Sequence, residues 1–348
     1  MRKRTCLLVA IFISICIWNG LERLISSDKG EIYRNGELSE IAKDVVAIPL
    51  ESIAGTPIKD VRDLYKEGDN LFLISRDILY RFNRKGEFIC RITNPKEIRV
   101  AGYMVDEVKQ QLIVLGNVND IYYYDYEGNL LSKKKLKRDF GKQQLLSAIL
   151  YRNKIYTIEQ EQVNIVEKKQ KVSIKCHIGV YDTAFHELEK RNLKEAELTH
   201  PTYVSKIQNL NLHVNPDTGE IYVCSFPYQP DYLLSDTLYL SHISLKKHPD
   251  EVPLYPIQMG SRFWFAFNRH ADDESKRYTY CWDRHENQAW QTGRGFKDDF
   301  YQSGYVTELL PMGVSGEQYF YCKNGEEVSR SFPEATDSTV VFIVNLKG

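Results

Sequence analysis

The sequence predicts an all-β protein built as a six-bladed β-propeller, and three observations carry this prediction. One hairpin pattern is written twice, at residues 79–89 and 121–131, with an offset of 42 residues. Aromatic residues are plentiful, with 23 Tyr and 15 Phe against 4 Met, and aromatic rings pack well on pleated strands. Except at residues 185–198, no segment longer than about ten residues has the helical period. A hairpin repeated at about 40 to 45 residues is typical of blades around an axis.

Residues 1–27 are predicted to be a signal peptide or membrane anchor. Basic residues at positions 2–4 precede an apolar run of 13 residues, Cys6 to Trp18, which is short for a membrane-spanning helix. Cys16 ends a stretch that resembles the lipobox of bacterial lipoproteins, although Ile15 stands where a small residue is expected. A cleaved signal, a lipidated Cys16 and an uncleaved anchor all stay open. Each of them implies export to the cell envelope, either to the periplasm or to a membrane-anchored surface.

Residues 28–43 are predicted to be a tether, and residues 44–348 to be the propeller. The first strand is Val45–Leu50, and the last is Val340–Val344. An open array of blades would expose two large apolar faces. We therefore expect the N-terminal strand to pair with the last strand and close the ring.

Six units follow in order, and each is expected to supply one blade. Their approximate bounds are residues 58–92, 98–136, 149–182, 203–245, 254–288 and 305–344. A charged insertion in the third unit, residues 161–175, is interpreted as an extended hairpin.

The turn of the repeated hairpin has its own chemistry. It begins with Asn83 or Asp125, whose side chain is expected to bond the backbone two residues on. Its fourth position holds Gly86 or Gly128, and glycine adopts the positive φ that such loops need. In the third unit, Phe185 occupies the position of this glycine.

The charge and the cysteines exclude several classes of site. A formal net charge of −1 lacks the clustered basic excess of a nucleic-acid-binding surface, so no nucleic-acid partner is predicted. The basic run at residues 133–138 is interpreted as an edge strand, with a polyanion site as the alternative. Five cysteines follow the signal, at spacings typical of neither a redox pair nor a zinc cluster, and most are expected to be buried.

In their order along the chain, six stretches resemble the bacterial exported six-bladed β-propellers, which are similar to NHL-repeat propellers and are often predicted lipoproteins. The stretches are Val46–Glu51, the hairpins Tyr80–Gly86 and Tyr122–Gly128, Asn215–Gly219, Gly295–Asp299 and Val340–Leu346. A turn that such proteins often carry, similar to Gly-Pro-Gly-Glu-Tyr, is reduced here to Asn94–Glu97, which keeps its Pro and Glu. The resemblance implies the fold and the compartment, because the family has no established activity.

Two sets of residues are candidate ligand-binding sites. Asp298 and Asp299 are adjacent carboxylates in a loop, and such a pair can hold a cation or a sugar hydroxyl; a turn and strand entry is the alternative. Trp264, Trp282 and Trp290 fall in one predicted blade and are candidates for stacking on a sugar, with packing between blades as the alternative.

No catalytic or metal motif is found in the sequence. His270 precedes an acidic loop of Asp272, Asp273 and Glu274, which lacks the ligand spacing of a calcium loop. Neither an HExxH helix nor a nucleophile elbow is present. We therefore predict no metal site and no cofactor, and Ca²⁺ enters only under an enzyme alternative.

The sequence favours an extracytoplasmic ligand-binding or protein-interaction module over an enzyme. The ligand is expected at the central mouth of the ring, where loops from all blades converge. Carbohydrate, peptide or an envelope protein are the expected partners, and the membrane is reached through the N-terminus alone. A metal-dependent hydrolase or glycan lyase on the same ring is the alternative, and a structural envelope component is a third.

Overall fold

The computed structural model describes residues 36–348 with internal gaps. The gaps are residues 95, 117–119, 137–142, 166–170, 199–209, 215–218, 220, 226–231, 234–250, 253–256, 271–276, 284, 287, 293–294, 315 and 336–337. The predicted signal segment with Cys16, and the tether before Gly36, lie outside the described residues. Within them, no helix has the length and apolar character needed to cross a bilayer.

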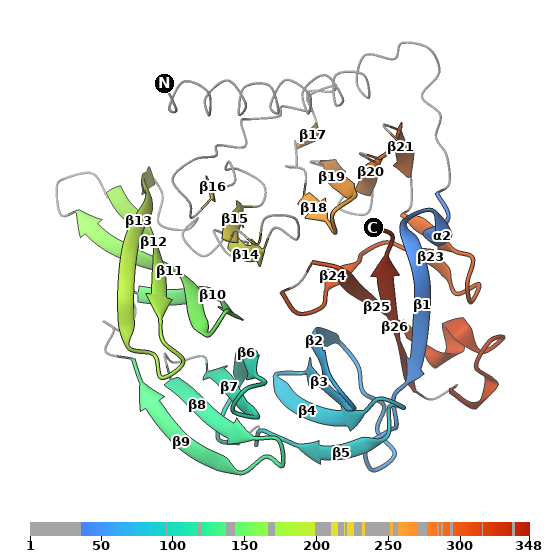
Figure 1. Ribbon diagram of the computed structural model, residues 1–348, viewed down its shortest axis with the longest axis horizontal. Helices are drawn as coiled ribbons and strands as arrows, with labels where there is room; N and C mark the ends of the chain where they lie inside the picture. Colours follow the sequence, from blue (N-terminus) through green and yellow to red (C-terminus); the bar gives the residue numbers. More distant parts are fainter. Residues whose placement is uncertain are drawn as a thin grey trace.

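The described strands form antiparallel sheets arranged around a central axis (Figure 1). The first sheet holds β2 (Val61–Glu67), β3 (Asn70–Ser75), β4 (Ile78–Asn83) and β5 (Phe88–Arg91). The second holds β6 (Val100–Asp106), β7 (Gln111–Gly116), β8 (Asp120–Asp125) and β9 (Leu130–Lys135). The third holds β10 (Gln143–Tyr151), β11 (Lys154–Ile165), β12 (Lys171–Tyr181) and β13 (Glu187–Leu198).

The later sheets continue the ring. A three-stranded sheet holds β14 (Leu210–Val214), β15 (Ile221–Ser225) and β16 (Tyr232–Leu233). The next holds β17 (Glu251–Val252), β18 (Ile257–Met259), β19 (Phe263–His270), β20 (Arg277–Asp283) and β21 (Gln288–Thr292). A separate pair, β22 (Phe296–Asp298) and β23 (Gly304–Val306), follows. The last sheet holds β24 (Leu310–Pro311), β25 (Gln318–Asn324), β26 (Thr339–Leu346) and β1 (Ala42–Pro49).

The predicted closure by the N-terminal strand is confirmed. β1 pairs antiparallel with β26, and the register places Val45 opposite Val344 and Pro49 opposite Val340. The short helix α2 (Leu38–Ile41) precedes β1, and its Leu38 and Ile41 are fully buried. Two short 3₁₀ helices, η2 (Gly325–Val328) and η3 (Pro333–Ala335), connect β25 to β26.

The hydrophobic core lies between neighbouring sheets. Along β3, Leu71 and Leu73 pack against the sheet of β26, whereas Phe72 and Ile74 pack against the sheet of β7. All four side chains are fully buried, and burying one such side chain contributes about 1.5 to 3 kcal/mol. A strand buried on both faces is a continuous apolar run, which explains why residues 71–74 do not alternate with polar residues.

The repeated hairpin turn is confirmed, and the third sheet contains a third copy of it. Gly86 and Gly128 have φ values of 85° and 86°, as expected, and Phe185 takes the same conformation with a φ of 57°. The N–H of each of these residues donates to the carbonyl of the residue that begins its turn: Asn83, Asp125 or Asp182. The burial of the Phe185 ring offsets the strain that glycine avoids elsewhere.

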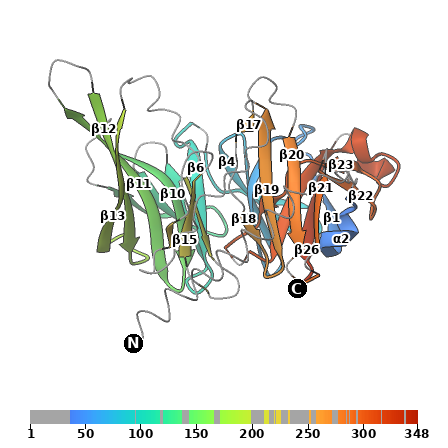
Figure 2. The ribbon, with the colours of Figure 1, turned by 90° about the horizontal axis from the view of Figure 1, so that it is seen from above.

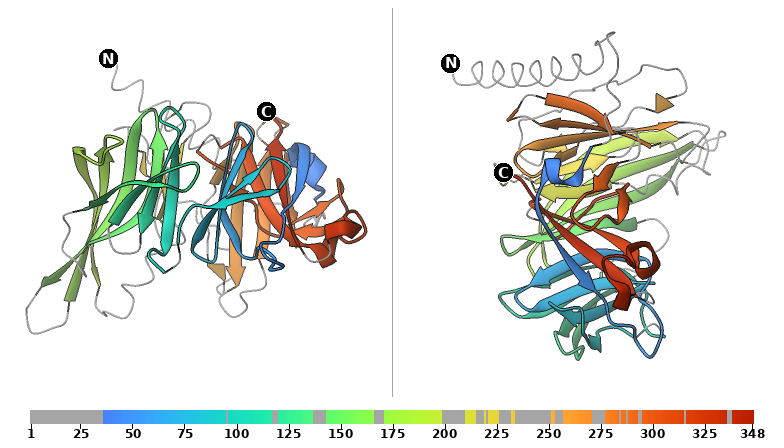
Figure 3. Two further views of the ribbon diagram at one scale, coloured as in Figure 1. Left: turned by 90° about the horizontal axis from the view of Figure 1, so that it is seen from below. Right: turned by 90° about the vertical axis from the view of Figure 1, so that its right-hand side faces the viewer.

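The third sheet is longer than its neighbours. β11 and β12 pair as far as Ile165 and Lys171, so the predicted hairpin at residues 161–175 is confirmed. Figures 2 and 3 show that its strands extend beyond the neighbouring sheets. Residues 187–198 form β13, so the helix that the period of residues 185–198 allowed is wrong. Pairing with β12 along the whole of β13 overrides the weak local preference for a helix.

Candidate functional site

The strands nearest the axis share an irregularity close to where they begin. In β2 the register shifts between Arg62 and Leu64, in β6 between Val100 and Gly102, and in β10 between Leu145 and Ser147. Each shift inserts one extra residue, a β-bulge, which re-aims a side chain and is common beside functional sites. Figure 1 shows these three strands next to the axis. We call the end of the ring at which they begin the mouth.

Asp63 is the bulged residue of β2. Its φ is 51°, a left-handed conformation that is uncommon for a residue with a side chain, and its side chain is exposed. Among the described residues, no group hydrogen-bonds its carboxylate. Strained residues of this kind persist only where the surrounding structure holds them in place, and they cluster at ligand-binding positions.

The surroundings of Asp63 combine access to solvent with nearby protein. Desolvation raises the pKa of the Asp63 carboxyl above its ordinary value, and the Arg62 guanidinium opposes this shift. An exposed carboxyl with a raised pKa is reached by water yet has protein close to it. A perturbed carboxyl that solvent can reach is a candidate binding group.

Charged side chains surround the mouth beside Asp63. Arg62 Nη2 donates to Asp77 Oδ1 and to the carbonyl of Val100, both at 2.8 Å, and so joins the β3–β4 turn to the start of β6. Arg76 and Asp77 form that two-residue turn, with φ values of 48° and 65°. Asp60, also in the left-handed region at 54°, lies 4.0 Å from Arg76. The mouth therefore offers both signs of charge.

A second polar centre lies in the third sheet and is built on Glu159, a buried carboxylate of β11. Its Oε1 accepts hydrogen bonds from the hydroxyls of Tyr181 at 2.5 Å and Thr157 at 2.9 Å, and Lys190 Nζ lies 3.8 Å from its Oε2. A Cβ at Gly179 would stand 2.8 Å from the same carboxylate, so only glycine fits beside it. The Glu159 carboxylate is therefore held in one place.

His177 of β12 lies opposite Glu159 and is also buried. Its Nδ1 is 2.7 Å from Asn192 Oδ1, and its Nε2 is 3.4 Å from Glu161 Oε2. Glu161 pairs with Gln143, the first residue of β10, so this centre is at the mouth end of its sheet. The β11–β12 connection corresponds to the β3–β4 turn that holds Asp77, because both join the second and third strands of a sheet.

Asp298 and Asp299 lie away from the axis. Figure 1 shows β23 and α2 on the outer side of β1. Asp298 is fully buried, and its carboxylate accepts the backbone N–H groups of Phe300, Tyr301 and Ser303 at 3.0 to 3.2 Å. These contacts agree with the alternative of a turn and strand entry.

Asp299 contacts the N-terminal segment. Its Oδ1 accepts the backbone N–H of Ser39 in α2 at 3.0 Å. Burial acts to raise the pKa of the Asp299 carboxyl, but the hydrogen bonds from Ser39 prevail and lower it. Ligand binding by Asp298 and Asp299 stays a prediction.

The three predicted tryptophans share one sheet. Trp264 in β19 is opposite Trp282 in β20, and Trp290 in β21 is opposite Cys281. Their side chains lie outside the described part of the structure, so sugar stacking stays a prediction.

The acidic loop after His270 and the cysteines are the remaining groups that were considered from the sequence. His270 is the last residue of β19, and the loop of Asp272, Asp273 and Glu274 lies outside the described residues. In the described part of the chain, no group of three or more His, Cys, Asp or Glu is placed to hold a metal ion. Burial raises the pKa of the Cys281 thiol well above its ordinary value and that of Cys322 to about 12, so neither thiol is a reactive nucleophile.

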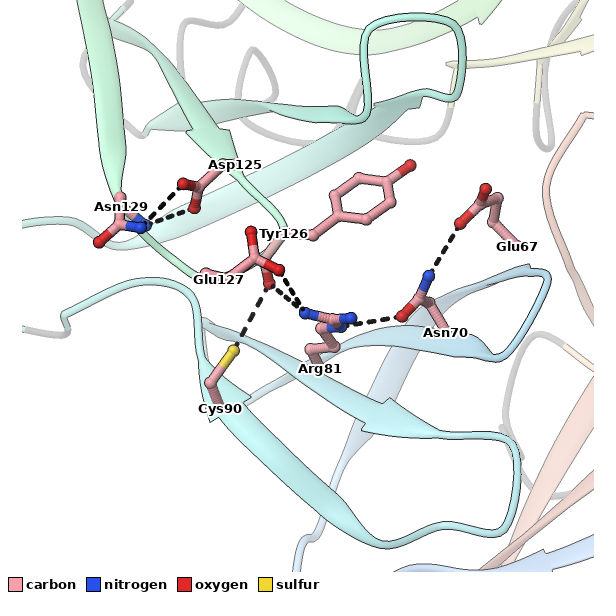
Figure 4. A network of polar contacts seen from close by, with 8 residues as sticks. All are labelled: Glu67, Asn70, Arg81, Cys90, Asp125, Tyr126, Glu127 and Asn129. Carbon is pink, nitrogen blue, oxygen red and sulfur yellow. Dashed lines mark hydrogen bonds and ion pairs between the residues drawn. The ribbon is translucent and has the colours of Figure 1, made fainter.

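A polar network joins the first two sheets near the β2–β3 connection (Figure 4). Arg81 Nε donates to Asn70 Oδ1 at 2.9 Å, and its Nη1 donates to the carbonyl of Tyr126 at 3.0 Å. Cys90 Sγ is 3.6 Å from the same carbonyl, and Glu127 is 3.3 Å from Arg81. Arg81 and Asn70 belong to the first sheet, and Tyr126 and Glu127 follow β8 of the second. The network therefore stabilises the contact between these two sheets.

The comparisons with known proteins agree on the fold. No family model matches the chain, and no curated protein sequence matches it either. A protein of Bacteroides fragilis, described by inference as exported, has a TM-score of 0.59 at 11% identity, over 91% of this chain and 98% of that one.

Two further solved structures are more distant. A protein of unknown function from Bacteroides thetaiotaomicron gives a TM-score of 0.45 at 8% identity, over 87% of this chain and 76% of that one. The β-propeller domain of Cps50 (Swd1) from Myceliophteria thermophila gives a TM-score of 0.43 at 8% identity, over 87% of this chain and 100% of that one. At 11% identity the likeness to the Bacteroides fragilis protein is one of fold alone. The propeller-like character of this chain is seen in its own antiparallel sheets around an axis.

Sequence reasoning missed Asp63, although the sequence carries a signal for it. Val61 and Leu64 are both buried and stand three residues apart, which breaks the period of two that a regular strand requires. Such a break indicates a bulge, and the bulge is what presents Asp63. The contacts around Glu159 had no comparable signal, because they join three strands.

Proposed function

We propose that this protein is an extracytoplasmic binding module and that its ligand binds at the mouth of the ring, against Asp63. The proposal includes six blades, one from each of the larger sheets, and export to the cell envelope. A carbohydrate, a peptide or an envelope protein is the expected partner. Association with the membrane is through the N-terminal segment alone, and lipidation at Cys16 is one way to achieve it.

One observation carries the proposal. Asp63 combines a strained backbone, an exposed carboxylate without a hydrogen-bond partner in the described structure, and a raised pKa, and it belongs to β2, a strand next to the axis. A buried structural aspartate such as Asp298 has its oxygens occupied by backbone N–H groups. Asp63 has none of these contacts, so its carboxylate is available to a hydroxyl or an amine of a ligand.

Thermal unfolding in the presence of a ligand panel tests this function. The purified protein is screened with glycans and peptides, and with Ca²⁺ and EDTA. A ligand at one hundred times its Kd stabilises the folded state by about 2.7 kcal/mol and raises the midpoint. We expect one panel member to raise the midpoint, and Asp63→Asn to abolish this shift.

The matched control is Asp69→Asn. Asp69 is an exposed carboxylate in the β2–β3 connection, at the other end of the ring from Asp63. Its variant should keep the ligand-induced shift. Loss of the shift in both variants, or in neither, contradicts a site at Asp63. A rise with Ca²⁺ and a fall with EDTA supports the metal-dependent enzyme instead.

A further inference from the structure

The backbone of Asp63 is held by a side chain from the neighbouring sheet. Tyr103 of β6 reaches across to the first sheet, and its hydroxyl donates to the carbonyls of Asp63 at 2.9 Å and Phe72 at 2.8 Å. A phenol has one proton, so the two carbonyls share it. The contact joins strands of two adjacent sheets at the bulge itself.

The bulge explains why such a contact is needed. In the ladder between β2 and β3, Arg62 pairs with Ile74 and Leu64 pairs with Leu73, so Asp63 has no partner strand residue. A backbone carbonyl without a ladder bond is satisfied by a side chain or by water. Tyr103 supplies that bond at a residue whose φ of 51° costs energy to maintain.

The chemistry of Tyr103 suits this role. Burial, the nearby Asp63 carboxylate and Tyr65 together raise the pKa of the Tyr103 phenol well above its ordinary value. The hydroxyl is therefore protonated, and is a donor, around neutral pH. A protonated hydroxyl matches two carbonyl acceptors.

We infer that Tyr103 is the positioning residue of the mouth, which locks the β2 bulge and so fixes the position of the Asp63 carboxylate. This inference rests on the proposed function for the role of Asp63. It adds that the geometry of the site in the first sheet is set by the second sheet. Tyr103 itself does not touch the ligand.

The test measures the Asp63 carboxyl directly, by NMR titration of the protein with ¹³C-labelled aspartate. In the unaltered protein we expect the Asp63 pKa above its ordinary value. In Tyr103→Phe the bulge relaxes and the carboxyl becomes more fully hydrated, so its pKa falls toward that value. Asp63→Asn assigns the resonance.

Tyr65→Phe is the matched control. Tyr65 lies two residues from Asp63 on the same strand, and its hydroxyl donates to Glu107 at 2.7 Å rather than to the bulge. This variant should leave the Asp63 pKa unchanged. An equal fall in both variants, or an unchanged Asp63 pKa in Tyr103→Phe, would overturn the inference.

Unfolding measurements separate positioning from general stability. Glycine adopts a positive φ without strain, so Tyr103→Phe should destabilise the protein less in an Asp63→Gly background than in the unaltered chain. Equal destabilisation in both backgrounds contradicts a lock on the bulge. These outcomes require no ligand, so they are independent of whether the panel finds one; if a ligand is found, Tyr103→Phe should weaken its binding more than Tyr65→Phe does.

Discussion

At the scale of single residues, the turn glycines illustrate how conformation and packing add. Gly86 has a φ of 85°, and a Cβ there would stand 2.0 Å from the carbonyl oxygen of Pro49. Its own carbonyl accepts the N–H of Glu51, so the turn of the first sheet docks on the end of the closing strand. Gly86 is therefore a contact between sheets as well as a turn residue.

We expect Gly86→Ala to lower the free energy of unfolding by about 3 to 5 kcal/mol, because the backbone of residue 49 must shift to admit the methyl group. Gly55→Ala is the matched control: its φ is 75°, but no atom lies within 4 Å of a Cβ there. It should cost about 1 kcal/mol, the strain of the left-handed conformation alone. Denaturant unfolding of both variants measures the difference. Equal losses would show that the Gly86 turn does not pack on β1.

At the scale of elements, an aspartate turn is used repeatedly, and in one place it is reinforced by an ion pair. Asp283 ends β20, and its Oδ1 accepts the backbone N–H groups of His285 and Glu286. Arg262, in the turn before β19, donates to both of its carboxylate oxygens at 2.6 to 2.9 Å. Burial acts to raise the pKa of the Asp283 carboxyl, but the bonds from Arg262 and the backbone prevail and lower it below its ordinary value.

This pair gives a pH-dependent prediction. Asp283 has a lower pKa in the folded than in the unfolded protein, so its contribution to stability is complete above the unfolded pKa and is lost as the pH falls through the folded one. Asp283→Asn should therefore cost about 3 kcal/mol at pH 7 and progressively less below pH 4, where the unaltered protein also loses the charge. Unfolding curves from pH 7 to pH 2 measure this. A cost independent of pH would contradict the role of the charge.

The same scale shows what the sequence could and could not predict. The hairpins at Gly86 and Gly128 were predictable, because an Asx residue and a glycine at fixed spacing suffice for the turn. Phe185 was not, since its positive φ is offset by the burial of its ring against Tyr181, at a centroid distance of 5.5 Å. Nor was β13, whose charged residues have no strand pattern of their own and are placed by pairing with β12.

At the scale of the whole molecule, the ring is closed by a strand from one end of the described chain and a strand from the other. Closure was predictable because β1 and β26 are both strongly apolar, and an open ring would leave such faces exposed. The candidate site at Asp63 was less predictable from the sequence. Asp63 acquires its position from a bulge in one sheet and from Tyr103 in the next, and contacts between sheets are not written in any short stretch of sequence.

The most direct test of a binding site at the mouth is a hydrogen-exchange footprint of the protein with the panel ligand that raises its unfolding midpoint. A ligand bound at the mouth protects the starts of the inner strands, in peptides that cover Asp60–Asp63 and Val100–Tyr103, and leaves the β2–β3 connection unchanged. Protection centred on Asp298 and Asp299, or on the β2–β3 connection, with unchanged exchange around Asp63, would contradict a binding site at the mouth.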